Sequence, residues 1–335
     1  MLRGVSQSMA GMTRREFILD AAVAGAALGL ARRTAISAPV PSQQSPDPKQ
    51  GFHRYKIGSA ECIAIYDGIQ EKALEPAPFK NASIGETKQA LAAAGMRTDI
   101  IPMPIAALVV KVNSRIVLCD VGGGGQAPAM DANSFCASGK LVVNLRAAGI
   151  DPGQIETILI SHFHPDHILG LMEAKTNRPI FPDAEIIVPG AEYRWWMASS
   201  MTGQLPEPYR AAAKRIQTVL PTWKNVLRMH EDDEVVPGIR FVSAPGHTSG
   251  HTAFQLASGD AQLLISGDAI CVPALGTAHP NWQGIYDQDG DKAVETRRRL
   301  MDWAITDNML ICGTHFPWPG VGRIAKEGAG YVFII

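Results

Sequence analysis

The sequence predicts an α+β protein in which two β-sheets pack face to face and helices cover their outer sides. Two observations indicate this class. Short apolar segments of strand length occur in two runs, and each run is accompanied by segments with helical periodicity. Glycine and proline contribute 32 and 23 of the 335 residues, which is typical of a fold with many strands and turns. No interior linker separates the two runs, so residues 54–335 are expected to form a single domain.

The N-terminal segment has the pattern of an export signal. Paired arginines within Thr13–Ile18 precede the apolar stretch Leu19–Ala31 and the small-residue end Ile36–Ala38. This order is typical of a signal peptide, and the paired arginines resemble the twin-arginine type that bacteria use for folded proteins. A retained membrane anchor is disfavoured, because a span takes about 20 apolar residues and this run has 13. We predict a signal peptide over residues 1–38, a linker over residues 39–53 and a periplasmic or secreted protein without membrane insertion after cleavage.

The first run of elements begins near Arg54. A helix ends at Gly149, a residue that commonly terminates helices, and the strand Thr157–Ser161 is continuously apolar, as expected for a buried strand. The other predicted strands of this run are Glu61–Tyr66, Ala106–Val112, Arg115–Asp120 and Ala184–Val188. The predicted helices are Leu141–Ala148, Gly190–Ser199 and Glu207–Leu220.

The second run contains the remaining elements. The segment Lys292–Thr306 is charged on one face and apolar on the other, which predicts a surface helix. The predicted strands are Val226–Met229, Ile239–Ala244, Ala253–Leu256, Gln262–Ser266 and Met309–Gly313, and residues 323–335 close the chain with strand-like composition.

Composition excludes some classes of function. The formal net charge is −1 and 19% of the residues are charged, so no basic excess indicates a nucleic-acid partner. Five cysteines are spread singly along the chain, which is poor evidence for a disulfide framework. The run Gly122–Gly125 lacks the following Lys-Ser/Thr of a phosphate-binding loop and is interpreted as a flexible turn.

The strongest chemical signal is a cluster of metal-competent side chains after the strand Thr157–Ser161. His162, His164, Asp166 and His167 occur within six residues. Alternate residues such as His162 and His164 can point to one ion, and the two residues after Pro165 can point to a second. Imidazole and carboxylate are suitable ligands for zinc and its neighbours.

Three further segments repeat the order of apolar strand, small residue and ligand-type residue. They place His247, Asp268 and His315 after the strands that end near residues 244, 265 and 312. Loops at one end of several strands can converge on one site, and small residues leave room for the approach of backbone and metal. The sequence therefore predicts one centre built from both runs of strands.

This pattern of HxHxDH, GHTxGH, GD and a later His resembles the metallo-β-lactamase superfamily. The resemblance implies an αββα sandwich with two metal ions at one edge. It assigns His162, His164 and His247 to the first ion. It assigns Asp166, His167 and His315 to the second ion, with Asp268 as the bridging carboxylate. No cysteine stands at the second-ion position, which favours the broader hydrolase branch over the β-lactamases that use one.

A closer resemblance is to methyl parathion hydrolases and related lactonase-type enzymes. It rests on Leu141–Gly149, Gln154–Gly170, Gly246–Thr252 and the C-terminal pattern from His315 to Tyr331. The segment Ala127–Gly139 has no obvious counterpart in those relatives. Of their aromatic pocket only Trp196 carries over clearly. A homodimer is implied by this resemblance alone.

Several residues near the ligands have predicted supporting roles. Asp120 and His251 are expected to hold the ligand loops by hydrogen bonds rather than to bind metal, with a simple turn role as the alternative for Asp120. Trp196 and Trp318 are candidate walls of the substrate pocket. Packing into the core is the competing interpretation for each of them, and the same two interpretations apply to Trp282.

The predicted activity is hydrolysis of a small, neutral, hydrophobic ester-like substrate: an organophosphate triester, a lactone or an aryl ester. Two divalent ions, zinc or alternatively manganese, cobalt or iron, would share a hydroxide as nucleophile, since coordination lowers the pKa of water to about 7. Asp166 and Asp268 are the predicted catalytic residues. Alternatives are hydrolytic dehalogenation of an activated aryl halide on the same centre, an iron-dependent redox activity and a non-catalytic binding protein.

Overall fold

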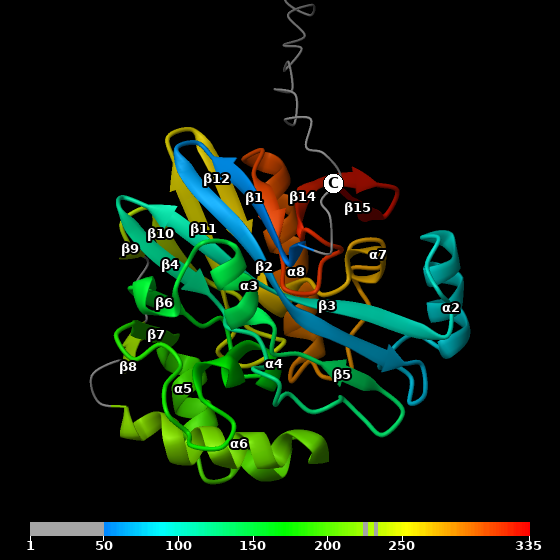
Figure 1. Cartoon of the computed structure of the whole chain (residues 1–335). Coiled ribbons are helices and arrows are strands. Elements are labelled where there is room, and N and C mark those ends of the chain that lie inside the picture. Colours follow the sequence, from blue (N-terminus) through cyan, green and yellow to red (C-terminus); the bar gives the residue numbers. More distant parts are fainter. Residues whose placement is uncertain (1–49, 224–226, 231–233) are drawn as a thin grey trace, which may run out of the picture. The chain divides into compact units, whose positions relative to one another are not determined.

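The computed structural model describes residues 50–223, 227–230 and 234–335 (Figure 1). The predicted signal peptide and residues 39–49 of the predicted linker lie outside the described residues. The chain divides after Ser45, and the unit Pro46–Ile335 holds every described residue. Its first strand begins at Phe52, inside the segment predicted as linker. Within the described part, no helix is long and apolar enough to cross a membrane.

The first sheet contains the strands β1 to β8, which precede all strands of the second sheet in the chain. Its order is β1-β2-β3-β4-β6-β7-β8, and β5 pairs with β2 outside this path. Pairing is antiparallel from β1 to β4 and parallel from β4 to β8. The strands are β1 (Phe52–Ile57), β2 (Ala60–Ala73), β3 (Ile100–Val112), β4 (Arg115–Cys119), β5 (Phe135–Ala137), β6 (Thr157–Leu159), β7 (Glu185–Pro189) and β8 (Leu227–His230).

The second sheet follows in the order β15-β14-β13-β12-β11-β10-β9. Only β12 and β13 are parallel neighbours in it, and this pair matters for the site because both strands end at the same edge. The strands are β9 (Glu234–Val236), β10 (Ile239–Ser243), β11 (Thr252–Ser258), β12 (Ala261–Ile265), β13 (Leu310–Cys312), β14 (Val321–Glu327) and β15 (Gly330–Ile334).

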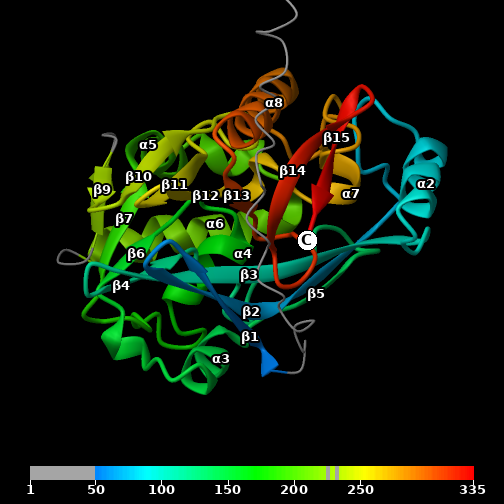
Figure 2. The ribbon, with the colours of Figure 1, turned by 90° about the horizontal axis from the view of Figure 1, so that it is seen from above.

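Helices cover the outer side of each sheet, as Figure 2 shows for α3 and α8 on opposite sides. The α-helices of the described residues are α2 (Ile84–Ala93), α3 (Leu141–Ala147), α4 (Pro165–Ile168), α5 (Gly190–Met197), α6 (Glu207–Val219), α7 (Pro273–Gly276) and α8 (Gly290–Thr306). The predicted α+β class, with two sheets between helical layers, is confirmed.

The side chains of β2 explain why the sheets form an inner pair of layers. Its consecutive residues point to opposite faces, and both faces are buried. Ile63 and Ile65 join the core under α3, α5 and α6, whereas Cys62 and Ala64 join the core between the two sheets. A third core lies between the second sheet and α8. Cys62, Cys119 and Cys312 are buried, and none of the five cysteines forms a disulfide.

Two differences from the predicted elements have local causes. The predicted strand Ala106–Val112 begins six residues earlier, at Ile100, although Pro102 and Pro104 lie in the added part. Proline lacks the backbone N–H that a strand paired on both sides would use. Strand β4 pairs only with residues 108–112 of β3, so Pro102 and Pro104 pair with β2 alone. A proline is tolerated in a strand segment that is paired on one side. Helix α2 was not predicted, although Ser83 and Glu86 form a capping box, which is a sequence signal for the start of a helix.

The glycine run binds a carboxylate of the protein itself. Asp67 accepts hydrogen bonds from the backbone N–H groups of Gly123, Gly139 and Leu141 at 2.8, 2.9 and 2.9 Å. Gly122 has a φ of +67°, and a Cβ there would lie 2.3 Å from the Asp67 carboxylate. Gly122 is therefore required by its close approach to Asp67.

Candidate metal centre

The predicted ligands gather because several strands end at one edge of the sandwich. In the parallel pair β12-β13, Ile265 lies opposite Cys312. Asp268 and His315 follow these residues by the same offset of three positions, so both side chains reach the same place. Strand β6 ends nearby, and the backbone bond from Thr252 N–H to Ser161 C=O (3.0 Å) joins the two sheets beside it.

The first group of ligands consists of three histidines that face one point. His164 Nδ1 lies 3.0 Å from His162 Nε2 and 2.9 Å from His247 Nε2. The Oδ2 atom of Asp268 lies 3.4 Å from His247 Nε2. Together, His162, His164, His247 and Asp268 offer ligand atoms that all lie within 4.8 Å of one another.

The second group lies on the other side of Asp268. His315 Nε2 is 3.2 Å from Asp166 Oδ2 and 3.3 Å from Asp268 Oδ2. His167 Nε2 is 3.3 Å from Asp268 Oδ1. The structure thus brings together all seven residues predicted as ligands, and all are buried. Asp268 is the residue that contacts both groups.

Hydrogen bonds at the far ring nitrogens orient the histidines. Nδ1 of His247 lies 2.9 Å from Asp287 Oδ1, and Nδ1 of His315 lies 2.8 Å from the Pro104 carbonyl oxygen. Each acceptor binds a proton on Nδ1, so Nε2 is the ring nitrogen directed into the site. Asp287 was not predicted, because it stands in a loop without a motif and becomes adjacent only through folding.

His251 supports the metal centre through hydrogen bonds to the backbone of the ligand loops. Its Nδ1 lies 3.1 Å from the Ala244 carbonyl oxygen, and its Nε2 accepts a hydrogen bond from the Asp268 backbone N–H at 3.0 Å. Burial lowers the pKa of His251 to about 3, so the ring stays neutral and can accept this bond. His251 is absent from both groups of ligand atoms.

Glu192 connects two ligand loops and was missed by the sequence reasoning. Its carboxylate accepts from Phe163 N–H at 3.0 Å, Gly250 N–H at 3.1 Å and the Thr248 hydroxyl at 2.7 Å. A Cβ at residue 250 would lie 2.0 Å from the Glu192 backbone nitrogen, which explains the glycine. A lone glutamate in a predicted helix carries no signal of this role.

The electrostatics of the two groups differ. Burial lowers the pKa of His162 and His164 well below the usual range, and neighbouring histidines lower it further. Burial also opposes protonation of His315, but Asp268 and Asp166 outweigh it and raise its pKa to about 10. Neutral imidazoles offer lone pairs, and the carboxylates attract positive charge to the second group.

Metal ions fit this donor set. His167 Nε2 and Asp268 Oδ1 are buried and have no hydrogen-bond partner among the described residues. Buried polar atoms are normally satisfied, and a divalent cation bound by both of these facing atoms would satisfy them. Five histidines and two carboxylates, without a cysteine ligand, suit divalent ions of the zinc series.

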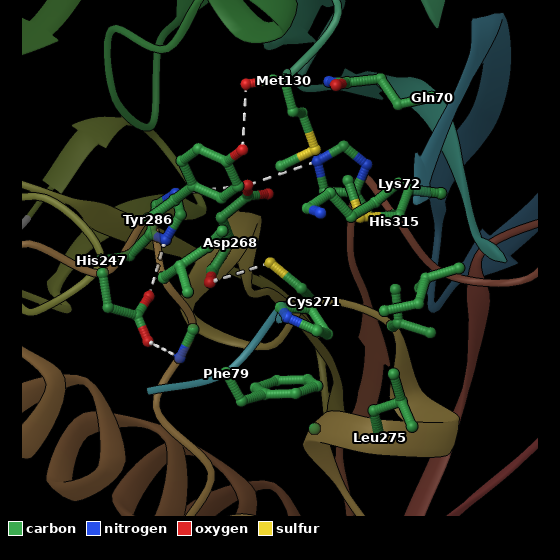
Figure 3. Close-up of a pocket in the computed structure, with 18 of the residues that line it drawn as sticks. Gln70, Lys72, Phe79, Met130, His247, Asp268, Cys271, Leu275, Tyr286 and His315 are labelled. Atoms are coloured by element: carbon green, nitrogen blue, oxygen red, sulfur yellow. Dashed lines mark hydrogen bonds and ion pairs between the residues drawn. The ribbon is translucent and has the colours of Figure 1, made fainter. Parts of the chain in front are cut away.

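A cavity opens beside the ligands (Figure 3). It has about 830 Å³ of space between its atoms, part of which is open to solvent. His164, Asp166, His247, Asp268 and His315 line one part of it. The apolar walls come from Pro78, Phe79, Ile101, Met103, Met130, Val272, Leu275, Trp282 and Ile285. A largely apolar pocket with a few polar groups is typical of small-molecule sites.

The two tryptophans predicted for this pocket lie elsewhere. Trp196 is fully buried and packs on Phe163, with ring centroids 6.0 Å apart. Trp318 meets Tyr66 edge-on at 5.7 Å. Neither lines the cavity, because α5 directs Trp196 into the core and Trp318 packs beside the core between the sheets. Trp282 is the tryptophan that lines the cavity.

Comparison with known proteins agrees with this geometry. The sequence model of the metallo-beta-lactamase superfamily matches residues 100–315. The N-acyl homoserine lactonase AiiB of Agrobacterium fabrum is 29% identical over 184 residues, which cover 50% of this chain and 63% of that protein. An N-acyl homoserine lactonase of a Bacillus species is 32% identical over 177 residues, which cover 52% of this chain and 62% of that protein. The chain spans somewhat less than two thirds of the length of these curated relatives.

Solved structures give the same result for the fold. AidC, a dizinc quorum-quenching lactonase solved with a hexanoyl-homoserine product, superposes with a TM-score of 0.77 and 28% identity. The match covers 85% of this chain and 97% of AidC. The hydrolase AbOPH of the beta lactamase superfamily has a TM-score of 0.75 at 24% identity, over 85% of this chain and 97% of AbOPH, and shows the fold alone.

Proposed function

This chain belongs to the metallo-beta-lactamase superfamily, and we propose that it is a metal-dependent hydrolase that opens lactones carrying an apolar acyl chain. The observation that carries the proposal is the position of both ligand groups at the wall of a largely apolar cavity. A polar reaction centre beside an apolar wall suits a substrate with a ring ester at one end and hydrocarbon at the other. The similarity to N-acyl homoserine lactonases supports the same choice.

Two ions, which we propose to be zinc, would be held by His162, His164 and His247 and by Asp166, His167 and His315, with Asp268 between them. When bound, such ions polarise the ester carbonyl and lower the pKa of water to about 7. The side chains of Asp166 and Asp268 line the cavity. Either carboxylate can take the proton that the attacking water releases and return it to the alcohol oxygen that leaves the ring.

The buried cations that line the cavity favour a neutral substrate. Lys72 donates to the carbonyl oxygens of Ala73 and Pro76 and pairs with Asp131 at 3.1 Å. Arg297 donates to three backbone carbonyl oxygens, those of Ala269, Pro280 and Trp282. Because protein groups occupy these donors, neither side chain is available to neutralise an anionic substrate such as a phosphate monoester.

A substrate panel on the zinc-loaded protein tests the proposal. It should contain acyl-homoserine lactones, unsubstituted lactones, aryl esters, organophosphate triesters and activated aryl chlorides. Hydrolysis of each substrate is monitored by the release of protons. We expect the highest kcat/KM for the lactones with an acyl chain. Full metal loading without lactone turnover would reject lactone hydrolysis, and faster triester hydrolysis would move the assignment to that class. An iron-type visible spectrum in protein as isolated would favour the redox alternative.

A further inference from the structure

Residues 127–139, the segment without an obvious counterpart in the relatives that the sequence resembles, contribute Met130 to the lining of the cavity. This segment leaves the glycine run, passes Met130 and returns as β5 along β2 (Figure 1). Met130 lines the cavity and, like Phe79 and Trp282, packs against the buried apolar cluster that contains Leu275. The segment therefore contributes a flexible apolar side chain close to the metal ligands.

An ion pair holds this segment to the first sheet. Asp131 Oδ2 lies 3.1 Å from Nζ of Lys72, whose side chain is 3% exposed. The other carboxylate oxygen accepts from Asn133 N–H at 3.0 Å and from the Ser134 hydroxyl at 2.9 Å. The Ser134 hydroxyl oxygen in turn accepts from Ala73 N–H at 3.1 Å. Asp131 thus joins its own turn to β2.

A second bond holds the segment from across the cavity. The Tyr286 hydroxyl donates to the Met130 backbone carbonyl at 3.0 Å, as Figure 3 shows. The Tyr286 ring also stacks on Tyr209, with centroids 6.0 Å apart and planes inclined by 21°. Tyr209 contacts the ring of the ligand His164 at 5.5 Å. Tyr286 therefore links the position of Met130 to the rings beside the metal ligands.

We propose that Met130, held by the Lys72–Asp131 ion pair and the Tyr286 hydroxyl, determines the length of acyl chain that the cavity accepts. This inference rests on the proposed function, since it names the part of the substrate that the apolar wall selects. Met130 is the specificity-determining side chain, and Asp131 and Tyr286 are positioning residues. The ion pair and the Tyr286 hydrogen bond keep the Met130 thioether over the cavity. A long acyl chain would therefore contact this thioether before its ester group reaches the metal ligands.

The test compares homoserine lactones with acyl chains from butanoyl to dodecanoyl. Met130→Ala removes the side chain that limits the space, and one methylene in an apolar pocket changes discrimination by about 10-fold or more. We expect the kcat/KM ratio of dodecanoyl to butanoyl lactone to rise by at least about 10-fold, mainly through a lower KM for the long substrate. A ratio within about twofold of wild type would overturn the proposal.

Two anchor variants test the positioning roles separately. Tyr286→Phe removes the donor but keeps the stacked ring, and Asp131→Asn removes the charge but keeps an acceptor for the turn. Each should shift the same ratio in the same direction by a smaller factor while the zinc content stays at the wild-type value. Phe135→Ser is the matched control, because Phe135 lies on the same segment but is 53% exposed, and its ratio should equal that of wild type.

A binding measurement separates this inference from the proposed function. If the wild-type protein opens no lactone, the activity proposal fails, but cavity length can still be measured. Straight-chain carboxylic acids from butanoic to dodecanoic are titrated while the fluorescence of Trp282, which lines the cavity, is followed, with Trp282→Phe identifying its signal. Met130→Ala should shift the tightest binding to a longer acid. If Met130→Ala leaves the preferred length of the acid unchanged, the inference is overturned, whether or not the protein hydrolyses lactones.

Discussion

The Nδ1 atom of His167 lies 2.8 Å from Oδ2 of Asp120. The same carboxylate accepts from the backbone N–H and the hydroxyl of Ser161, each at 2.8 Å, and the Ser161 hydroxyl lies 3.0 Å from Nδ1 of His162. One buried aspartate thereby orients a histidine in each ligand group, directly for His167 and through Ser161 for His162. The supporting role predicted for Asp120 thus extends to both proposed ion positions.

Asp120→Asn should weaken metal binding without removing a proposed ligand. The amide keeps the size of the side chain but loses the negative charge that favours Nδ1–H on His167. Loss of such a partner typically costs about 10- to 100-fold in metal affinity or activity. Zinc affinity by competition with a chromogenic chelator and kcat/KM are the measurements. Asp183→Asn, at an exposed position, is the control and should match wild type.

Asp268→Ala should remove the carboxylate that contacts both ligand groups. We expect activity to fall by about 10³-fold or more, corresponding to several kcal/mol of transition-state stabilisation. Metal analysis should also give less than the wild-type metal content. Asp260→Ala, on the exposed turn between β11 and β12, should keep both values. Retention of full metal content and activity in Asp268→Ala would refute the bridging role.

Chelation should abolish hydrolysis reversibly. The ligand side chains are buried, and the two facing atoms His167 Nε2 and Asp268 Oδ1 have no protein hydrogen-bond partner, so the centre depends on a cation for catalysis and for local stability. Dialysis against a strong chelator should lower both activity and the melting temperature, and zinc, cobalt or manganese should restore them. Turnover at the wild-type rate in metal-free protein would contradict the proposed mechanism.

Glu192→Gln should destabilise the protein even though Glu192 is no proposed ligand. The buried carboxylate accepts three hydrogen bonds from two ligand loops, and an amide NH₂ group would face at least one of these donors. An unsatisfied buried polar group costs about 1–3 kcal/mol. Thermal unfolding of the metal-loaded variant should show this loss as a lower melting temperature. Glu207→Gln, at an exposed position, is the control. Equal melting temperatures for the two variants would contradict the role of Glu192 in connecting the two ligand loops.

Most strands and helices could be predicted because their signals are local. The apolar run before His162 and the apolar periodicity before Gly149 each identify an element from neighbouring residues alone. The early part of β3 could not be predicted in this way. Pro102 and Pro104 argue against a strand until it is known that only one side of the strand is paired there.

The predicted ligand positions also follow from local order, since each ligand comes directly after a strand. The cavity walls do not, because no spacing rule connects Phe79, Met130 and Trp282, which meet only in the folded chain. For the same reason the sequence leaves two interpretations open for Trp196, a pocket wall or a core residue, and only the structure shows that it belongs to the core.

The sequence by itself determined the fold class and the identity and order of the seven proposed ligands, because strand patterns and ligand chemistry are properties of short segments. Only the tertiary structure decided that Asp287 and Glu192 hold the ligand loops, that Met130 lines the cavity, and that Trp282 lines it in place of Trp196 and Trp318. These roles depend on contacts between residues far apart in the chain, such as Tyr286 and Met130. Such contacts arise from the packing of whole layers, which sets distances that no local pattern encodes.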